Sequence, residues 1–245
     1  MTFVDYQKKG SVVIITINRP DRRNALGREV TAEITDACKR FAVDDGARVA
    51  ILTGTDNSFS AGADLREVTG PPMPVQAFNA VETVVKPVIA AVNGYAIGAG
   101  CLLAMACDIT FAARSATFSL PEIARSIPLG PERLLAQGIP VPIAMELLLT
   151  GAPLTAQRAY EVGMVNKVVP DEELMTTALS VAEKIAGFSP WVARVDKEAK
   201  IRALSLSKEV LEQEQARRLM ARQSGDLKEA VKAFIEKRPP ATGGD

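Results

Sequence analysis

Residues 87–107 read PVIAAVNGYAIGAGCLLAMAC, an uncharged run that lies between Lys86 and Asp108. The run opens with β-branched residues typical of a buried strand and turns at Asn93-Gly94. It then passes through Gly98-Ala99-Gly100 into an apolar stretch with helical character. A strand, a glycine turn and a helix start leave backbone N–H groups directed into a cavity with no side chains in the way. The run therefore predicts a site whose chemistry depends on backbone amides.

A membrane-spanning helix is the alternative interpretation of this run. Its length suits a bilayer, and Gly94 and Gly98 form a GxxxG pair. The Asn-Gly turn in the middle and the change from a strand pattern to a helix pattern favour a protein outside the membrane. The N-terminal sequence MTFVDYQKKG has an acid at Asp5 and lacks an apolar segment, so we expect no signal peptide.

The composition limits both the partners and the chemistry. The chain has 245 residues, 47% of them apolar, which suffices for one large domain or a domain with an appendage. Lys+Arg and Asp+Glu balance at 29 each, so we expect neither nucleic acid nor a membrane as partner. Histidine is absent, which excludes Ser-His-Asp, Cys-His and His-metal sites, and no metal is expected. We expect the scattered Cys38, Cys101 and Cys107 to be reduced and buried in a cytoplasmic protein.

Strand and helix patterns alternate through the first half of the chain, whereas the second half is mostly helical. This order predicts an α/β fold with buried strands. Gly187–Pro190 is a candidate boundary between a core, residues 1–188, and a helical appendage, residues 189–245. The predicted strands are Phe3–Lys8, Val12–Asn18, Val49–Thr53, a segment from Val88, Ile109–Ala112 and Thr117–Leu120. The predicted helices are Arg28–Phe41, Val75–Val84, Pro142–Leu149, Thr155–Glu161, Asp171–Ala186, Pro190–Ala203, Lys208–Gln223 and Asp226–Lys237.

Two loops rich in small residues are expected to act together. The first is SFSAGADL at 58–65, within the predicted loop Gly54–Asp64 and its flank, and the second is Gly94–Gly100. Two N–H groups from such loops can bind a carbonyl oxygen that becomes negative, and one donor of this kind contributes about 10²–10³ in rate. The alternative is that the glycines only permit tight packing. A dinucleotide-binding motif is incomplete here because position 103 is leucine.

Several segments together resemble one family over nearly the whole chain. They are SAGADL at 60–65, PVIAAVNGYAIGAGCLLAMACDI at 87–109, PEI at 121–123, AMELLLTG at 144–151, NRPDRRNAL at 18–26 and SGDLKEAVKAFIEKRPP at 224–240. The sequence is similar to the crotonase family, the enoyl-CoA hydratases and isomerases. The resemblance implies a spiral of ββα units followed by a C-terminal helical region that builds homotrimers, often paired into hexamers. It also implies an acyl-CoA substrate, with coenzyme A as part of that substrate and no tightly bound cofactor.

The resemblance assigns roles to particular residues. The N–H groups of Ala63 and Ala99 match the family's oxyanion hole. The CoA-contacting positions match Arg23, Ala25 and Leu26, and the Ala61 carbonyl lies near the adenine in relatives. Phe234 and Lys237 match positions that reach the CoA of a neighbouring subunit. A solvated surface charge is the alternative for Arg23 and Lys237. The substrate-binding set is completed by Asp64, Leu65, Gly98 and Leu102.

The departure from the family pattern concerns the carboxylates. Hydratases of the family carry two glutamates that hold and activate a water. The second is present as Glu122, but Leu102 stands at the position of the first. The loop after Glu122 is also about two residues shorter than usual. A single base is enough to move a double bond, so the expected reaction is Δ3,Δ2-enoyl-CoA isomerisation with Glu122 as proton shuttle.

Other interpretations stay open at this point. One is a hydratase or dehydratase of an unusual acyl-CoA, in which Glu132 replaces the missing carboxylate. Another is an acyl-CoA-binding protein without catalysis, with Glu122 at a helix start or in an ion pair. We expect residues 69–74 to line the acyl pocket. Asp64 and Asp108 are expected to cap or anchor loops, and Trp191 and Tyr95 to be packing residues.

Overall fold

The computed structural model describes residues 2–67, 75–204, 208–223, 225–238 and 240. The chain forms two compact units, each built from two separate segments. Unit 1 comprises Met1–Phe118 and Leu154–Ala203, and unit 2 comprises Ser119–Pro153 and Leu204–Asp245. These units cut across the predicted division at residue 188. The role of residues 189–245 in oligomerisation stays a prediction.

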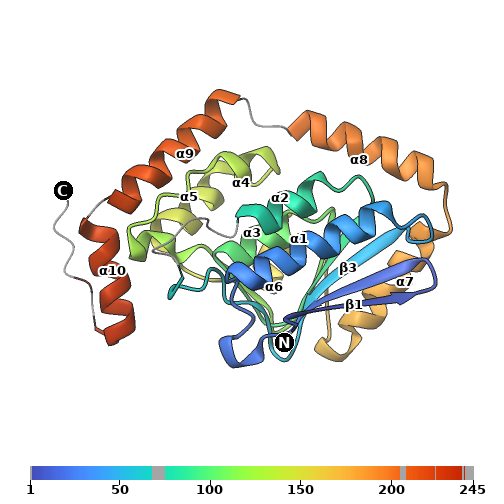
Figure 1. The fold of residues 1–245 in the computed structure, drawn as a ribbon, viewed down its shortest axis with the longest axis horizontal. Helices are drawn as coiled ribbons and strands as arrows, with labels where there is room; N and C mark the ends of the chain where they lie inside the picture. Colours follow the sequence, from blue (N-terminus) through green and yellow to red (C-terminus); the bar gives the residue numbers. More distant parts are fainter. Residues whose placement is uncertain (1, 68–74, 205–207, 224, 239, 241–245) are drawn as a thin grey trace. The chain divides into compact units, whose positions relative to one another are not determined.

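The main sheet belongs to unit 1 and confirms the predicted α/β class (Figure 1). Its first two strands pair antiparallel, and the following strands are parallel. Every residue of β3 and β5 is buried, which is typical of parallel strands covered on both faces. In spatial order the strands are β1 (Val4–Lys9), β2 (Val12–Ile17), β3 (Val49–Gly54), β5 (Val88–Val92), β7 (Ile109–Ala113) and β10 (Lys167–Val169).

A second sheet of short strands was largely missed by the sequence patterns. It contains β4 (Ser58–Ser60), β6 (Tyr95–Ile97), β8 (Thr117–Ser119) and β9 (Leu154–Thr155), and only β8 was predicted. β4 lies in the segment predicted as a loop, and it pairs parallel with β6. A strand of two or three residues is too short to show an alternating pattern, so tertiary pairing rather than local sequence defines it.

The helices of unit 1 follow the predicted apolar stripes. α1 buries Val30, Ile34, Cys38 and Phe41 on one face and contacts β1 and β2, whereas α7 contacts β2, β3, β5 and β7. Figure 1 shows these helices together with the strands. The helical segments are η1 (Pro20–Arg22), α1 (Arg28–Val43), α2 (Val75–Thr83), α3 (Ala99–Met105), α6 (Ala156–Glu161), η3 (Asp171–Glu173), α7 (Leu174–Ala186) and α8 (Pro190–Leu204).

The run 87–107 is divided among three elements and is not one helix. β5 occupies its first part, β6 follows the Asn93-Gly94 turn, and α3 has only seven residues. Within the described parts of the chain, no helix is long and apolar enough to cross a membrane. The spanning-helix interpretation of this run is therefore wrong.

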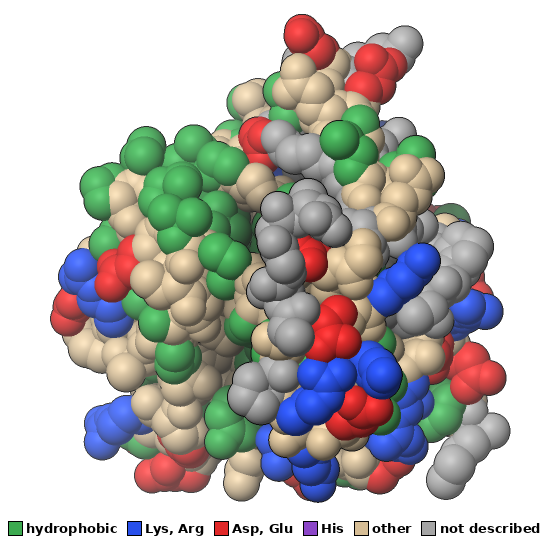
Figure 2. Space-filling model, turned by 90° about the vertical axis from the view of Figure 1, so that its left-hand side faces the viewer, with side chains coloured by type: hydrophobic (Ala, Val, Ile, Leu, Met, Phe, Trp, Pro, Cys, Tyr) green, Lys and Arg blue, Asp and Glu red, His purple; other side chains and the backbone are tan. Residues whose placement is uncertain are grey.

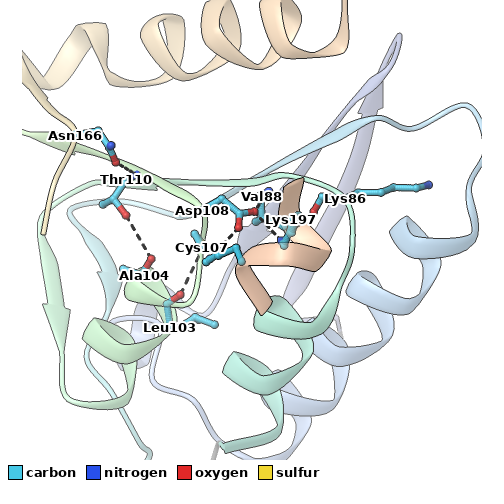
Figure 3. Close-up of polar contacts among 10 residues, drawn as sticks. Lys86, Val88, Leu103, Ala104, Cys107, Asp108, Thr110, Asn166 and Lys197 are labelled. Carbon is cyan, nitrogen blue, oxygen red and sulfur yellow. Dashed lines mark hydrogen bonds and ion pairs between the residues drawn. The ribbon is translucent and has the colours of Figure 1, made fainter. Parts of the chain in front are cut away.

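A buried ion pair fastens α8 to the core of unit 1 (Figure 3). The Lys197 ammonium lies 2.6 Å from Asp108 Oδ2 and also donates to the Lys86 carbonyl at 3.0 Å. Lys200 lies 2.9 Å from Asp108 Oδ1, and the Val88 amide donates to Oδ2 at 2.8 Å. The expectation that Asp108 anchors chain segments is confirmed.

Two residues expected to be packing residues are exposed. Trp191 on α8 is 70% exposed and Tyr95 in β6 is 46% exposed, so within this chain that expectation is wrong. The cysteines agree with expectation, since Cys38, Cys101 and Cys107 are all buried free thiols.

Unit 2 contains a short 3₁₀ helix, η2 (Pro121–Arg125). Two longer helices contact it, α5 (Val141–Thr150) and α10 (Gly225–Glu236). Gly151 ends α5 with a positive φ of 63° and packs close to Pro121. Figure 2 shows hydrophobic side chains gathered in a patch on the face that it draws. Exposed large apolar side chains of this unit include Leu219, Met220, Phe234 and Ile235. The helices are α4 (Glu132–Ala136), α5 (Val141–Thr150), α9 (Lys208–Gln223) and α10 (Gly225–Glu236).

Candidate active site

The segment 18–26 is held against β4 by a buried asparagine that sequence reasoning missed. Asn24 is fully buried and has a positive φ of 57°, next to Arg23 at 49°. Its Oδ1 accepts from the Arg19 amide at 2.8 Å, and its Nδ2 donates to the carbonyls of Thr55 and Ser58 at 3.1 and 2.6 Å. Asparagine tolerates left-handed backbone and bonds nearby main chain. That preference is the signal in NRPDRRNAL that points to a structural turn.

The residues expected to contact CoA early in the chain lie close together in unit 1. The Ala61 amide donates to the Arg23 carbonyl at 2.9 Å. Arg23 is exposed, Ala25 is half-buried and Leu26 is buried. The fold thus brings these four residues to one stretch of backbone, with the Arg23 side chain at the surface.

The first small-residue loop leaves one amide without a backbone acceptor among the residues that the structure describes. The Leu26 amide donates to the Gly62 carbonyl at 2.7 Å, and the Asp64 amide donates to the Leu26 carbonyl at 3.2 Å. Leu26 and Ala63 therefore form a parallel bridge. In such a bridge the N–H group of the second residue, Ala63, points away from the pairing strand. The Ala63 amide is accordingly available to another acceptor.

The second loop likewise presents a backbone amide to another acceptor, at the start of α3. Gly98 precedes the helix with φ 55° and ψ −122°, a conformation suited to glycine. The first intrahelical bond runs from the Leu102 amide to the Gly98 carbonyl at 3.0 Å. The Ala99 amide lies ahead of that bond, where a helix has no internal acceptor for it. Leu102 itself is buried, at 8% exposure.

Close packing brings the two loops into contact. A Cβ atom built on Gly62 would lie 2.6 Å from the Ile97 carbonyl oxygen and 3.5 Å from the Ala99 nitrogen. One built on Gly100 would lie 2.5 Å from the Ser60 carbonyl oxygen. These glycines do permit close packing of the two loops. The same packing brings the unpaired amides of the two loops into one region of unit 1.

Asp64 and its neighbours anchor the first loop. The Arg19 guanidinium lies 2.9 Å from Asp64 Oδ2, and the Arg66 amide donates to Asp64 Oδ1 at 3.2 Å. Asp64 is 9% exposed, and Leu65 is half-buried. The expectation that Asp64 anchors a loop is confirmed. The substrate-binding roles of Asp64 and Leu65 stay predictions.

Glu122 is the titratable group in unit 2 whose environment is most suited to proton transfer. It lies in the first turn of η2, and its Oε2 is buried with no hydrogen-bond partner among the described residues. Burial raises the pKa of Glu122 to about 7, while its own backbone amide and the charge of Arg125 act in the opposite direction. Glu122 lies at a helix start, as the non-catalytic interpretation expects, and its catalytic role stays a prediction.

The remaining predicted positions are placed as follows. Phe234 is exposed on α10, and the Cζ of Arg125 lies 5.2 Å from the centre of its ring. Lys237 is exposed just after α10 with a positive φ of 55°. Glu132 is half-buried at the start of α4. Residues 69–74, expected to line the acyl pocket, lie outside the described residues.

Comparison with known proteins agrees with these features. The family described as Enoyl-CoA hydratase/isomerase matches residues 7–244. The chain is 42% identical to a probable mitochondrial enoyl-CoA hydratase of Dictyostelium discoideum over 248 aligned positions, which cover 96% of this chain and 88% of the relative. It is 36% identical to a 2,3-dehydroadipyl-CoA hydratase of Escherichia coli strain K12, with 94% of each chain covered.

Among solved structures, a carnitinyl-CoA hydratase from Mycobacterium avium aligns with a TM-score of 0.92 at 34% identity, covering 100% of both chains. The predicted crotonase fold is thereby confirmed, and the relatives cited carry hydratase names. The chain belongs to the enoyl-CoA hydratase/isomerase, or crotonase, family of acyl-CoA enzymes.

Proposed function

We propose that the protein is a Δ3,Δ2-enoyl-CoA isomerase that uses Glu122 as its single proton-transferring carboxylate. The observation that carries the proposal is the buried leucine at position 102. The resemblance places the first of the two hydratase glutamates at this position. A leucine side chain neither accepts a proton nor holds a water, so hydration by two carboxylates is not available in that form.

Two backbone amides support the electrostatic half of the reaction. The N–H groups of Ala63 and Ala99 have no acceptor in the pairing pattern described above, and their loops are in contact. The thioester carbonyl oxygen would accept a hydrogen bond from each of these amides. As negative charge develops on the thioester oxygen, the two hydrogen bonds become stronger. Each donor contributes a factor of about 10²–10³ to the rate.

Glu122 supports the proton-transfer half. A base with a pKa near 7 is partly ionised at neutral pH, and its conjugate acid is strong enough to return the proton. Glu122 takes a proton from C2 of a 3-enoyl thioester, and the C2–H electron pair delocalises into a dienolate. Glu122 then returns the proton at C4, which leaves a C2=C3 double bond. No water is consumed, and an apolar Leu102 disfavours water near the dienolate.

The proposal also includes the residues that bind the CoA moiety. We propose that the CoA moiety is bound by a set comprising Arg23, Ala25, Leu26, Ala61, Asp64, Leu65 and Gly98, and that Phe234 and Lys237 reach the CoA of a neighbouring subunit. No tightly bound cofactor is part of this proposal.

The assembly belongs to the same proposal. We propose a homotrimer, or a dimer of trimers, formed through residues 189–245. Exposed Leu219, Met220 and Ile235 on the last helices support this, because large apolar side chains gathered at a surface mark interaction sites. The buried free thiols of the three cysteines support a cytoplasmic location.

Hydration or dehydration of an unusual acyl-CoA is the second candidate function. The hydratase names of the relatives favour it. In that case Glu132, at the start of α4, or a group of the substrate replaces the carboxylate missing at Leu102. A protein that binds acyl-CoA without turnover is the third candidate.

The deciding experiment assays a panel of 3-enoyl-CoA and 2-enoyl-CoA esters for new conjugation and for water addition. Wild type is compared with Glu122→Gln and with a control, Glu146→Gln, which removes an exposed carboxylate of the same unit. We expect wild type and the control to isomerise 3-enoyl-CoA, and Glu122→Gln to lose at least 10²-fold in kcat while still binding the ester.

Three results would overturn the proposal. Fast hydration of crotonyl-CoA without isomerisation would favour the second candidate. Tight binding of the esters with no turnover on the whole panel would favour the third. Equal rates in wild type and Glu122→Gln would remove Glu122 from the mechanism.

A further inference from the structure

Glu122 and Arg125 lie on the same side of η2. They are three residues apart, and in a 3₁₀ helix side chains at i and i+3 eclipse one another. Glu122 Oε2 is a buried acceptor and Arg125 Nε is a buried donor, and neither has a hydrogen-bond partner among the described residues. A buried carboxylate oxygen and a buried guanidinium nitrogen thus belong to residues one helical turn apart.

The Arg125 side chain is held in this position from two directions. Its Nη1 donates to the Pro121 carbonyl at 3.1 Å, at the first residue of η2. Its Cζ lies 5.2 Å from the centre of the Phe234 ring, which α10 contributes. A guanidinium over an aromatic face is attracted by the ring quadrupole. Helix α10 therefore helps to fix the position of a charge that acts on Glu122.

We propose that Arg125 is a positioning residue which, seated by Phe234, increases the ionised fraction of the Glu122 carboxylate at neutral pH. This inference rests on the proposed role of Glu122 as the base. It adds a function for Arg125, and it gives Phe234 a role within its own chain besides the expected contact with CoA.

Electrostatics supports this assignment. Burial raises the pKa of Glu122 to about 7 even though Arg125 lowers it. Without the cation, the protonated form would dominate at neutral pH, because burial disfavours an isolated charge. An opposite charge within about 4–6 Å lowers a carboxyl pKa by about 1–3.

Other charges of unit 2 do not replace Arg125. Among the described residues, Arg125 is the cation whose charge acts on Glu122. On α5 and α10, the two helices that contact η2, most charged side chains are exposed, and Glu229 is paired with Arg238. These charged residues are Glu146 on α5 and Asp226, Lys228, Glu229, Lys232 and Glu236 on α10.

The test measures the titration of Glu122 directly and without substrate. Difference infrared spectra of the carboxyl stretch, assigned by subtraction of Glu122→Gln, are recorded between pH 5 and pH 9. The variants are Arg125→Gln, Arg125→Lys and Phe234→Leu. The matched control is Lys228→Gln, which removes an exposed cation from α10.

In Arg125→Gln we expect the titration midpoint of the Glu122 carboxyl group to rise by about one pH unit or more. This rise lowers the ionised fraction of Glu122 at pH 7 about fivefold. Arg125→Lys restores most of the wild-type midpoint. Phe234→Leu moves the midpoint in the same direction by less, and Lys228→Gln leaves it in place. An unchanged midpoint in folded Arg125→Gln, or an equal shift in Lys228→Gln, would overturn the inference.

The pH profile of kcat/KM separates positioning from structural damage. For a positioning role, the acidic limb in Arg125→Gln moves to higher pH while the plateau at high pH is retained. A lowered plateau with an unmoved limb contradicts the inference. If the infrared midpoint shifts as expected but no protein of the set isomerises 3-enoyl-CoA, the proposed function fails and the electrostatic role of Arg125 stands.

Discussion

Gly62 lies against the main chain at Ile97, so close that a methyl group on Gly62 would come within 2.6 Å of the Ile97 carbonyl oxygen. Gly62 lies in the loop that follows β4, and Ile97 is the last residue of β6, the strand that pairs parallel with β4. Because backbone meets backbone there, neither loop can yield by a change of rotamer. This contact determines how the amides of Ala63 and Ala99 are set relative to one another.

Gly62→Ala is therefore expected to damage the proposed oxyanion site. The alanine would carry a strained φ of 89° and a clash with main chain. We expect kcat/KM for 3-enoyl-CoA to fall by about 10²-fold or more, since displacing one oxyanion donor has an effect of this size. The measurement is steady-state kinetics beside a thermal unfolding curve.

Gly163→Ala is the matched control for this change. Gly163 has a similar φ of 83°, but a Cβ atom there would meet no atom within 4 Å. Both variants lose stability through backbone strain, whereas only Gly62→Ala should lose activity beyond that. Equal activity losses in the two variants would show that the Gly62–Ile97 contact has no special importance for catalysis.

Long periodic segments were predictable from the sequence. The stripe of α1 and the antiparallel pair β1–β2 follow from local patterns, because burying one face requires apolar residues at a regular spacing. The resemblance likewise identified the two small-residue loops. Their contact, however, depends on pairing between β4 and β6, and three-residue strands have no pattern of their own.

Long-range polar contacts were not predictable. Asn24 is fully buried, although its residue type is usually exposed, because its amide satisfies main-chain groups on two other segments. Asp108 was expected to anchor a loop, but its partner Lys197 is 89 positions away. Nor did local composition indicate that segments 119–153 and 204–245 form one unit. Such associations arise from tertiary packing.

The pH dependence of stability gives a second prediction, for Glu122→Gln. The folded pKa of Glu122 is raised from 4.5 to about 7, so the folded protein holds a proton that the unfolded chain releases between these values. The resulting stabilisation is complete below pH 4.5 and is lost as pH rises through 7. We expect Glu122→Gln to be more stable than wild type by about 1 kcal/mol or more at pH 8, and by less at pH 5.

Urea unfolding at the two pH values measures this difference. Glu146→Gln, which changes an exposed carboxylate, controls for the loss of a negative charge and should show the same stability difference at both values. If Glu122→Gln is less stable than wild type at pH 8, the buried, ionised Glu122 carboxylate does not destabilise the folded protein.

Leu102→Glu tests the consequence of the missing carboxylate. The new side chain would begin one turn into α3 and add a second acid at a buried position. We expect crotonyl-CoA hydration to rise at least tenfold over wild type, since a well-placed acid or base contributes about 10²–10⁴. Leu102→Gln is the control, because it has a similar size and polarity but transfers no proton at neutral pH.

Hydration is followed by the loss of the conjugated enoyl-thioester absorbance. An equal gain in Leu102→Glu and Leu102→Gln would mean that polarity at this position, rather than a second carboxylate, admits water. Fast hydration in wild type that Leu102→Glu abolishes would contradict the single-carboxylate proposal.

The last prediction concerns the ion pair that fastens α8. The Lys197 side chain is 3% exposed and that of Asp108 is 17% exposed. Lys197→Met leaves the Asp108 carboxylate with Lys200 and the Val88 amide as partners. We expect a loss of about 3 kcal/mol in unfolding free energy, because removing one partner of a buried pair leaves the other charge poorly compensated.

Arg194→Gln on the same helix breaks an exposed pair with Glu198 and should lose less than about 1 kcal/mol. The double variant Lys197→Met with Asp108→Asn removes both charges, so its loss should be smaller than the sum of the single losses. Additive losses, or equal losses in Lys197→Met and Arg194→Gln, would show that the Asp108–Lys197 contact does not hold α8 to the core.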